Sequence, residues 1–399
     1  MTRRLPKAFS EDTMRIVWAN SRDRSPGTAG SPGIDGVTAP EFSSDLKFQI
    51  ARTRLQLQRQ TYQFSKLRVF PIPKKSGGER IIAVPTVRDR FLQRVVLRHL
   101  ENDPRFNAAS HIAYGFSKGR TLAAAQSAAL SLRTKYPWVL QADIVSFFDR
   151  IDRRILRRKV TNAVRSKIVR EILLQIINCE LDESDPKAAS LAVENQIKRG
   201  TGLRQGMPAS PMLSNLLLKE FDQALSQAGF HAIRYADDIA IFGKTQSECL
   251  DALTFVKSEL HKLKLEIPEL SEATKTNIAG PTEDVEFLGV AIRQFSDGYR
   301  FCIPKDKIRK IDESLSKISS FEYCLRHRRT IPDMMSTIDA MIAGHARSMA
   351  HVADLDSFVG RLTALKAEHV KRLLEGVLGA RVVAELTHER RAVLGVEPF

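Results

Sequence analysis

Two adjacent aspartates, Asp237 and Asp238, stand between apolar segments that are each short enough to be one strand of a hairpin, within the run Ile233–Phe242. Paired carboxylates placed in this way are typical of a metal site, although a solvated turn also accepts Asp-Asp. A third acid, Asp143, lies in the apolar run Val139–Asp149, which predicts a buried strand. Because a buried carboxylate needs a partner, we expect the three aspartates to gather around a pair of Mg²⁺ ions, which prefer carboxylate, water and phosphate oxygens.

Seven short motifs follow one another along the chain, and two of them contain these acids. They are Gly33–Thr38, Val69–Arg80, Tyr114–Arg120, Asp143–Phe148, Gly202–Pro211, Tyr235–Asp238 and Glu286–Gly289. In this order they resemble the motifs of bacterial reverse transcriptases, specifically the group II intron-like branch, over nearly the whole chain from about Ser31 onward. Each motif alone is weak, but chance rarely places seven in the same order.

The resemblance implies an α+β fold, the right-hand polymerase fold, in which fingers and a palm with an antiparallel sheet precede an all-helical thumb. It divides the chain into an N-terminal extension at residues 1–66, the fingers and palm at 67–303 and the thumb at 304–399. In the last region apolar residues recur at three- and four-residue steps, which is typical of helix-bundle packing.

Local patterns place further elements along the chain. Two short strands, Leu67–Pro73 and Arg80–Val84, flank a glycine-bearing segment and predict a hairpin. Strands near Glu286–Arg293 and Tyr299–Ile303 are expected to close the palm, and a helix is expected after Pro211. Helical spacing of apolar residues predicts other helices at residues 10–24, 40–60, 86–100, 122–132, 152–181 and 246–263.

The resemblance also assigns roles to the acids. Asp143, Asp237 and Asp238 become the catalytic residues, and the carbonyl oxygen of Ile144 joins them as a metal ligand. Two Mg²⁺ ions, for which Mn²⁺ is a substitute, then promote attack of a primer 3′-hydroxyl on the α-phosphorus of an incoming dNTP.

Ten further residues are expected around the substrates. Those expected to bind the nucleotide are Lys74, Arg80, Phe148, Gln205 and Lys275. Those expected to bind nucleic acid are Lys75, Lys118, Arg120, Arg204 and Tyr235.

Several of these residues have an alternative interpretation. The basic hairpin tip is typical of phosphate binding, yet an ordinary solvated hairpin has the same composition. Phe148 is either a ring that excludes the 2′-hydroxyl of a ribonucleotide or a core residue beside Phe147. Arg120 and Lys118 either hold the template backbone or cap a loop, and the motif around Lys275 departs from the usual Asn-x-x-Lys-Thr form.

Composition narrows the classes of partner and compartment. The 399 residues carry a net charge of +16, which indicates a polyanionic partner, although a generally basic surface is an alternative. The four cysteines show no Cys-x-x-Cys spacing and the nine histidines no metal-binding spacing. Neither a signal peptide nor an apolar run of roughly 20 residues is present, so we expect a cytoplasmic protein that does not associate with membranes.

These patterns together predict an RNA-directed DNA polymerase whose partners are an RNA template, dNTPs and a DNA product, with a homo-oligomer or a partner protein left open. Residues Ile342–Ala350 loosely resemble the thumb segment of intron-type enzymes, and the residues after them show no maturase-type DNA-binding or nuclease motif. No retron-type Val-Thr-Gly signature is found beyond the palm. The chain therefore resembles free-standing bacterial enzymes, many of which serve antiviral defence and copy a noncoding RNA.

Alternatives remain at this stage. One is a group II intron-type maturase or retroelement reverse transcriptase. Another is a protein-primed or template-independent nucleotidyltransferase, or an RNA polymerase, on the same palm. The third is a nucleic-acid-binding protein that lost catalysis, against which the presence of all three acids argues.

Overall fold

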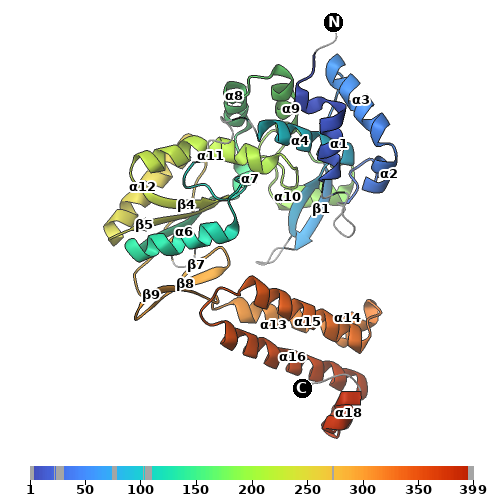
Figure 1. The fold of residues 1–399 in the computed structure, drawn as a ribbon, viewed down its shortest axis with the longest axis vertical. Coiled ribbons are helices and arrows are strands. Elements are labelled where there is room, and N and C mark those ends of the chain that lie inside the picture. The colour runs from blue at the N-terminus through green and yellow to red at the C-terminus, as the bar shows by residue number, and fades with distance from the viewer. Residues whose placement is uncertain are drawn as a thin grey trace. The chain divides into compact units, whose positions relative to one another are not determined.

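The computed structural model describes residues 4–21, 23, 31–73, 79–101, 103, 110–271 and 274–393. The chain forms two compact units, whose helices and strands are drawn in Figure 1. Each unit has its own apolar core. The first unit comprises Met1–Ala129 and Tyr136–Ile278, and the second comprises Leu130–Lys135 and Ala279–Phe399.

A four-stranded sheet in the first unit carries the acidic residues, in the strand order β4-β5-β3-β6. Strands β3 (Trp138–Asp143) and β4 (His231–Tyr235) both pair antiparallel with β5 (Asp238–Gly243), and β6 (Asn277–Ala279) lies beside β3. Every residue of β5 after the first is buried, as expected for a central strand that is covered on both faces. The predicted acid-bearing strand and acidic hairpin are confirmed.

Two long helices pack on this sheet and support the hairpin that β4 and β5 form. Helix α11 (Ser210–Gln227) contacts β4, while α12 (Gln246–Lys262) contacts β3 and β5, and the two helices contact one another (Figure 1). The sequence sets the start of α12, because the Thr245 side chain accepts a hydrogen bond from the Glu248 amide as an N-cap.

The predicted β-hairpin is also present, formed by β1 (Arg68–Pro73) and β2 (Glu79–Val84). Helix α4 (Val87–Leu100) follows, and its N-cap is Thr86, which accepts a hydrogen bond from the Asp89 amide. At the amino end, η1 (Lys7–Phe9), α1 (Glu11–Ala19) and α2 (Ala39–Ser44) contact α4, and α3 (Leu46–Arg59) contacts α1 and α2. The helix predicted at residues 40–60 therefore forms as two helices, α2 and α3.

The single helix predicted over residues 152–181 is wrong. The chain forms α8 (Arg153–Ala163) and α9 (Lys167–Ile177), which are separated by an extended Val164 and by Ser166, the N-cap residue of α9. The two shorter helices pack against one another, so the break lets both bury their apolar faces. The other helices of this region are α6 (Leu122–Lys135), α7 (Phe147–Arg150) and α10 (Pro186–Glu194).

The second unit begins with a three-stranded antiparallel sheet of β7 (Val285–Phe287), β8 (Val290–Phe295) and β9 (Gly298–Cys302). These strands were expected to close the palm, but they form a sheet of their own that groups with the helices after it. The helices are α13 (Lys307–Ile318), α14 (Phe321–Arg326), α15 (Ile331–Ser348), α16 (Leu355–Leu378), α17 (Ala380–Ala384) and α18 (His388–Val393).

The helical composition predicted after residue 304 is confirmed, whereas the domain boundaries at 67 and 304 stay predictions. Apolar residues from the sheet and the helices share one core, which extends from Val290 to Val383. Across the described part of the chain, no helix combines the length and the apolar character that crossing a membrane requires.

Candidate active site

The ends of three strands bring the predicted acids to one edge of the sheet. Asp143 is the last residue of β3 and Asp238 is the first of β5, and the two are direct cross-strand partners. Tyr235, the last residue of β4, pairs with Asp238 from the other side. Directly opposed residues in antiparallel strands lie about 4.5–5.5 Å apart at Cα and point to the same face. The carboxylates of Asp143 and Asp238 therefore share one face of the sheet.

Asp237 lies in the tight turn that joins β4 to β5. The turn depends on a left-handed backbone at Ala236, where φ is 60°. The amide of Ile144, the residue after Asp143, donates a hydrogen bond to the Asp237 carbonyl oxygen at 3.4 Å. The acidic turn is thus tied directly to the end of β3, so Asp143 lies beside Asp237 and Asp238 although it is far from this adjacent pair in the sequence.

The pKa values of the acids reflect this crowding. Burial raises the pKa of Asp238 to about 6, and the charges of Asp143 and Asp237 add to the rise. Burial and the charge of Asp143 likewise raise the pKa of Asp237. Like charges and low solvent access both disfavour ionised carboxylates. The site therefore holds more negative charge than its surroundings neutralise.

Lys275 supplies part of the missing positive charge. Its Nζ donates to Asp143 Oδ2 at 2.5 Å, although the lysine side chain is 71% exposed. Burial alone would lower the pKa of Lys275, but its hydrogen bond with Asp143 and the field of the aspartates raise it. The lysine that resemblance assigned to the nucleotide is thus placed beside a predicted catalytic acid.

The chemistry of the site fits a divalent cation. Carboxylate and carbonyl oxygens are the ligands that Mg²⁺ prefers. Among the described residues, no three Asp, Glu, His or Cys side chains are arranged to hold a metal ion as they stand, and the Lys275 ammonium is paired with Asp143. One ammonium cannot balance three aspartates that lie close enough for their charges to raise one another's pKa. Asp143, Asp237 and Asp238, with the carbonyl of Ile144, are the residues that would hold the ion.

Other predicted nucleotide-binding residues lie in the same unit. Arg80 is exposed on β2, and its charge opposes the rise in the pKa of Asp237 that burial and Asp143 cause. Phe148 is half-buried on α7, with its ring 5.3 Å from that of Phe147. Lys74 and Lys75 lie outside the described residues.

The turn that contains Gln205 packs on the hairpin. Its carbonyl oxygen accepts a hydrogen bond from the Ala83 amide at 2.7 Å. At Gly206 φ is 107°, and a Cβ there would lie 2.6 Å from the Ala83 carbonyl oxygen. Only glycine permits both this backbone and this approach. The sequence Arg-Gln-Gly therefore fixes Gln205 beside β2.

Arg204 has an internal role in this structure. Its side chain is 3% exposed, and Nη2 donates to Glu180 Oε2 at 2.6 Å and to the Lys198 carbonyl oxygen at 2.9 Å. A buried guanidinium that is already paired does not reach a nucleic-acid strand. Burial of Arg204 thus argues against the predicted nucleic-acid contact and for anchoring of the turn that follows it.

The structure also bears on the choice between template binding and loop capping for Arg120 and Lys118. Arg120 Nη1 donates to three carbonyl oxygens of one loop, and its guanidinium lies 4.9 Å from the Tyr114 ring centroid. The accepting residues are Ser110, His111 and Ala113. These contacts favour a loop cap for Arg120. Lys118 is exposed and forms a long ion pair with Glu101 at 3.7 Å, so it remains accessible.

Sequence reasoning missed the buried ion pair that lies beside the acidic turn, between Arg234 in β4 and Asp222 in α11. A signal was present, because Arg234 interrupts an apolar strand and Asp222 interrupts an apolar helix face. Buried charges require partners, so two unexplained charges in apolar segments predict a pair.

Comparison with known proteins agrees with this geometry. Residues 72–292 match the family described as reverse transcriptase (RNA-dependent DNA polymerase). The chain belongs to this reverse transcriptase family. The matched residues include the hairpin strand β2, the three aspartates and the four-stranded sheet that carries them. The prediction of an α+β polymerase fold is thereby confirmed.

Several relatives of this reverse transcriptase-family chain cover about half of it. Protein YkfC from Escherichia coli K12 is 31% identical over 206 residues, which are 50% of this chain and 51% of that protein. Retron Ec83 reverse transcriptase from Escherichia coli is 29% identical over 43% of this chain and 51% of its own length. Group II intron-encoded protein LtrA from Lactococcus lactis subsp. cremoris is 27% identical over 50% of this chain and 31% of its own length.

The chain thus spans about half the length of the first two relatives and less of the third. Among solved structures, apo telomerase from Candida tropicalis aligns with 84% of this chain and 68% of its own at 12% identity. The TM-score of 0.43 is too low to add to the family assignment.

Proposed function

We propose that this protein is an RNA-directed DNA polymerase that builds a DNA strand from dNTPs on an RNA template. The observation that carries the proposal is the direct pairing of Asp143 with Asp238 on one sheet face, beside the turn that holds Asp237. Family membership over residues 72–292 supports the same reaction.

The residues of the site suit nucleotidyl transfer. Bound Mg²⁺, or Mn²⁺ in its place, would make a primer hydroxyl more acidic and stabilise the charge of the leaving pyrophosphate. Asp143, Asp237 and Asp238 hold the negative charge that such ions need. Arg80 and Lys275 offer positive charge to the triphosphate of the nucleotide, as phosphate oxygens accept charge-assisted hydrogen bonds from both.

The decisive test is Asp237→Asn with a primed RNA template and labelled dNTPs. We expect nearly complete loss of synthesis, because the amide keeps the shape of the turn but removes a metal-binding charge. Folding, measured by thermal melting, and RNA binding, measured by filter retention, should persist. Asp251→Asn, which changes an exposed aspartate on α12, is the matched control and should extend normally. Robust extension by Asp237→Asn contradicts the proposal.

A parallel reaction with labelled NTPs separates reverse transcription from RNA synthesis on the same fold. We expect incorporation of dNTPs only. A product that forms without added RNA, even after the protein has been treated with ribonuclease, would instead indicate template-independent nucleotidyl transfer.

The biological setting is a finer proposal. We propose a cytoplasmic enzyme that copies a noncoding RNA in bacterial antiviral defence, alone, as a homo-oligomer or with a partner protein. The resemblance to free-standing bacterial enzymes supports it. Sequencing the RNA that copurifies with the protein, together with its DNA product, tests the template. Plating of phages on cells that carry the wild type or Asp237→Asn tests defence, and equal plaque counts would contradict it.

A further inference from the structure

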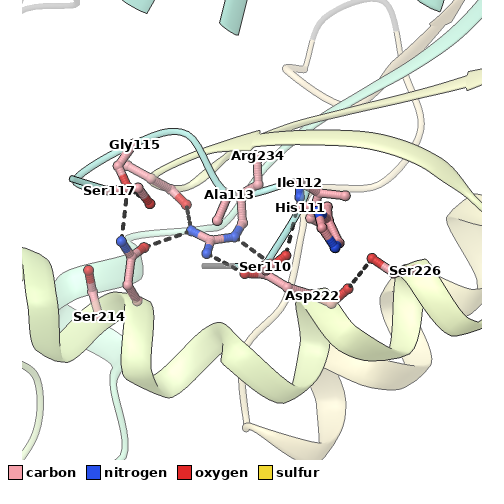
Figure 2. Close-up of polar contacts among 12 residues, drawn as sticks. Ser110, His111, Ile112, Ala113, Gly115, Ser117, Ser214, Asp222, Ser226 and Arg234 are labelled. Carbon is pink, nitrogen blue, oxygen red and sulfur yellow. Dashed lines mark hydrogen bonds and ion pairs between the residues drawn. The ribbon is translucent and has the colours of Figure 1, made fainter. Parts of the chain in front are cut away.

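A fully buried guanidinium lies directly beside the acidic turn. The Arg234 side chain is 1% exposed and that of its partner Asp222 is 2% exposed. Arg234 Nε donates to Asp222 Oδ1 at 2.7 Å and Nη2 donates to Oδ2 at 2.6 Å (Figure 2). This bidentate geometry uses two fixed donors of the planar guanidinium, which the ammonium of a lysine cannot reproduce.

The remaining nitrogen of Arg234 reaches the turn itself. Nη1 donates to the Ala236 carbonyl oxygen at 2.8 Å, and Ala236 is the residue with the left-handed backbone. Residues with a side chain rarely adopt this conformation, and surrounding contacts must hold it. The Ala236 carbonyl belongs to the peptide bond that leads into Asp237. Arg234 is therefore hydrogen-bonded to the backbone immediately before Asp237 and Asp238.

The same guanidinium joins a third segment. Arg234 Nη1 also donates to Asn215 Oδ1 at 3.2 Å, and Asn215 Nδ2 donates to the Gly115 carbonyl oxygen at 2.9 Å. The backbone of Arg234 is also paired with this segment. Its amide donates to the Ile112 carbonyl oxygen at 2.7 Å, and its carbonyl oxygen accepts a hydrogen bond from the Tyr114 amide at 2.8 Å. In Figure 2 the loop Ile112–Gly115 and helix α11 both approach Arg234, which lies in β4.

We propose that Arg234 is a positioning residue that orients the catalytic turn, with Asn215 as its link to the loop Ile112–Gly115. The inference rests on the proposed function, because it concerns the same acids. If Arg234 only stabilised the fold through its ion pair, its hydrogen bonds to Asp222 would suffice. Arg234 instead uses Nη1 to fix the carbonyl before Asp237, so the direction of Asp237 and Asp238 depends on it.

Arg234→Lys tests this directly, because it keeps the charge and removes the fork. Mn²⁺ binding to the protein without substrates is followed by electron paramagnetic resonance, and dNTP incorporation gives kcat and KM. We expect Mn²⁺ affinity and kcat to fall on the order of 10- to 100-fold, as for other residues that orient metal ligands. The KM for dNTP should change little, since the hairpin and the Gln205 turn are untouched.

Arg90→Lys is the matched control. Arg90 is also buried in the first unit, and it pairs with Asp23 and donates to the Pro85 carbonyl oxygen, away from the acidic turn. The substitution likewise replaces a buried, paired guanidinium with an ammonium. We expect it to lower the melting temperature and to leave Mn²⁺ affinity unchanged.

Asn215→Ala keeps the inference testable where Arg234→Lys fails to fold. Asn215 is half-buried, and its loss leaves the Arg234–Asp222 pair intact. We expect a loss of Mn²⁺ affinity and kcat in the same direction, up to about 10-fold. Folded variants of Arg234 and Asn215 that match the wild type in both quantities overturn the proposal.

The two readouts separate this inference from the proposed function. Wild-type protein that binds Mn²⁺ more tightly than Arg234→Lys upholds the positioning role even where no template is extended. Wild-type extension together with unchanged kcat and Mn²⁺ affinity in Arg234→Lys overturns positioning and leaves the polymerase assignment standing.

Discussion

The substitution Gly115→Ala, which replaces one hydrogen by a methyl group, should displace the turn that carries Asp237. A Cβ built on Gly115 would lie 2.4 Å from the Ala236 amide nitrogen and 3.0 Å from the Tyr235 carbonyl carbon. Both atoms belong to the backbone, so no flexible side chain can move aside. Gly115 has no left-handed backbone, and Gly115→Ala therefore adds a collision without adding conformational strain.

The required shift follows from these distances. Ordinary contact begins at 3.4 Å, so the turn or the loop must move by about 1 Å. The loop is held by the Asn215 amide and by the three carbonyl contacts of Arg120. The turn is held by Arg234, and the two must share the movement. A misplacement of about 1 Å costs on the order of 100-fold in rate, and overpacking costs about 1–3 kcal/mol of stability.

Steady-state dNTP incorporation on primed RNA and thermal melting measure the two effects. Gly119→Ala is the matched control, because Gly119 lies in the same loop with φ at 76° and open space around its Cβ position. It should lose about 1 kcal/mol through backbone strain without pushing the turn. Gly115→Ala that stays folded and keeps its rate within about threefold of wild type would refute the reasoning, since the predicted factor is far larger.

Two further predictions concern selectivity and pH. Phe148→Ala should increase the use of ribonucleotides in a competition between NTPs and dNTPs, because a ring beside the sugar excludes the 2′-hydroxyl, and unchanged selectivity would return Phe148 to the core. Glu180 has a lowered pKa, since burial raises it but hydrogen bonds from Arg153, the Gly200 amide and Arg204 outweigh burial. A lowered folded pKa contributes stability above the ordinary value of 4.5 that is lost as the pH falls below it. As the pH is lowered from 6 to 3, the melting temperature of Glu180→Gln should therefore fall less steeply than that of the wild type. Parallel curves would contradict the role of this carboxylate.

The family and the local elements of the site follow from the amino-acid sequence alone. The order of seven short motifs is a property of the chain alone, and residues 72–292 match the family model. The alternation of apolar runs with Asp143 and with the pair Asp237 and Asp238 predicted a buried strand and a hairpin, because strand formation depends on nearby side chains.

Which distant groups lie together depends on how the strands and helices pack. Register between β3 and β5 places Asp143 opposite Asp238, whereas a shift of one residue would turn the carboxylates to opposite faces. Packing of α11 against β4 supplies Asp222 to Arg234. The same kind of packing buries Arg204, for which the resemblance to known motifs suggested a contact with nucleic acid. Such pairings depend on register and on the shape of packed surfaces, which no local stretch of sequence contains, so a charge in an apolar segment predicts that a partner exists but not which residue it is.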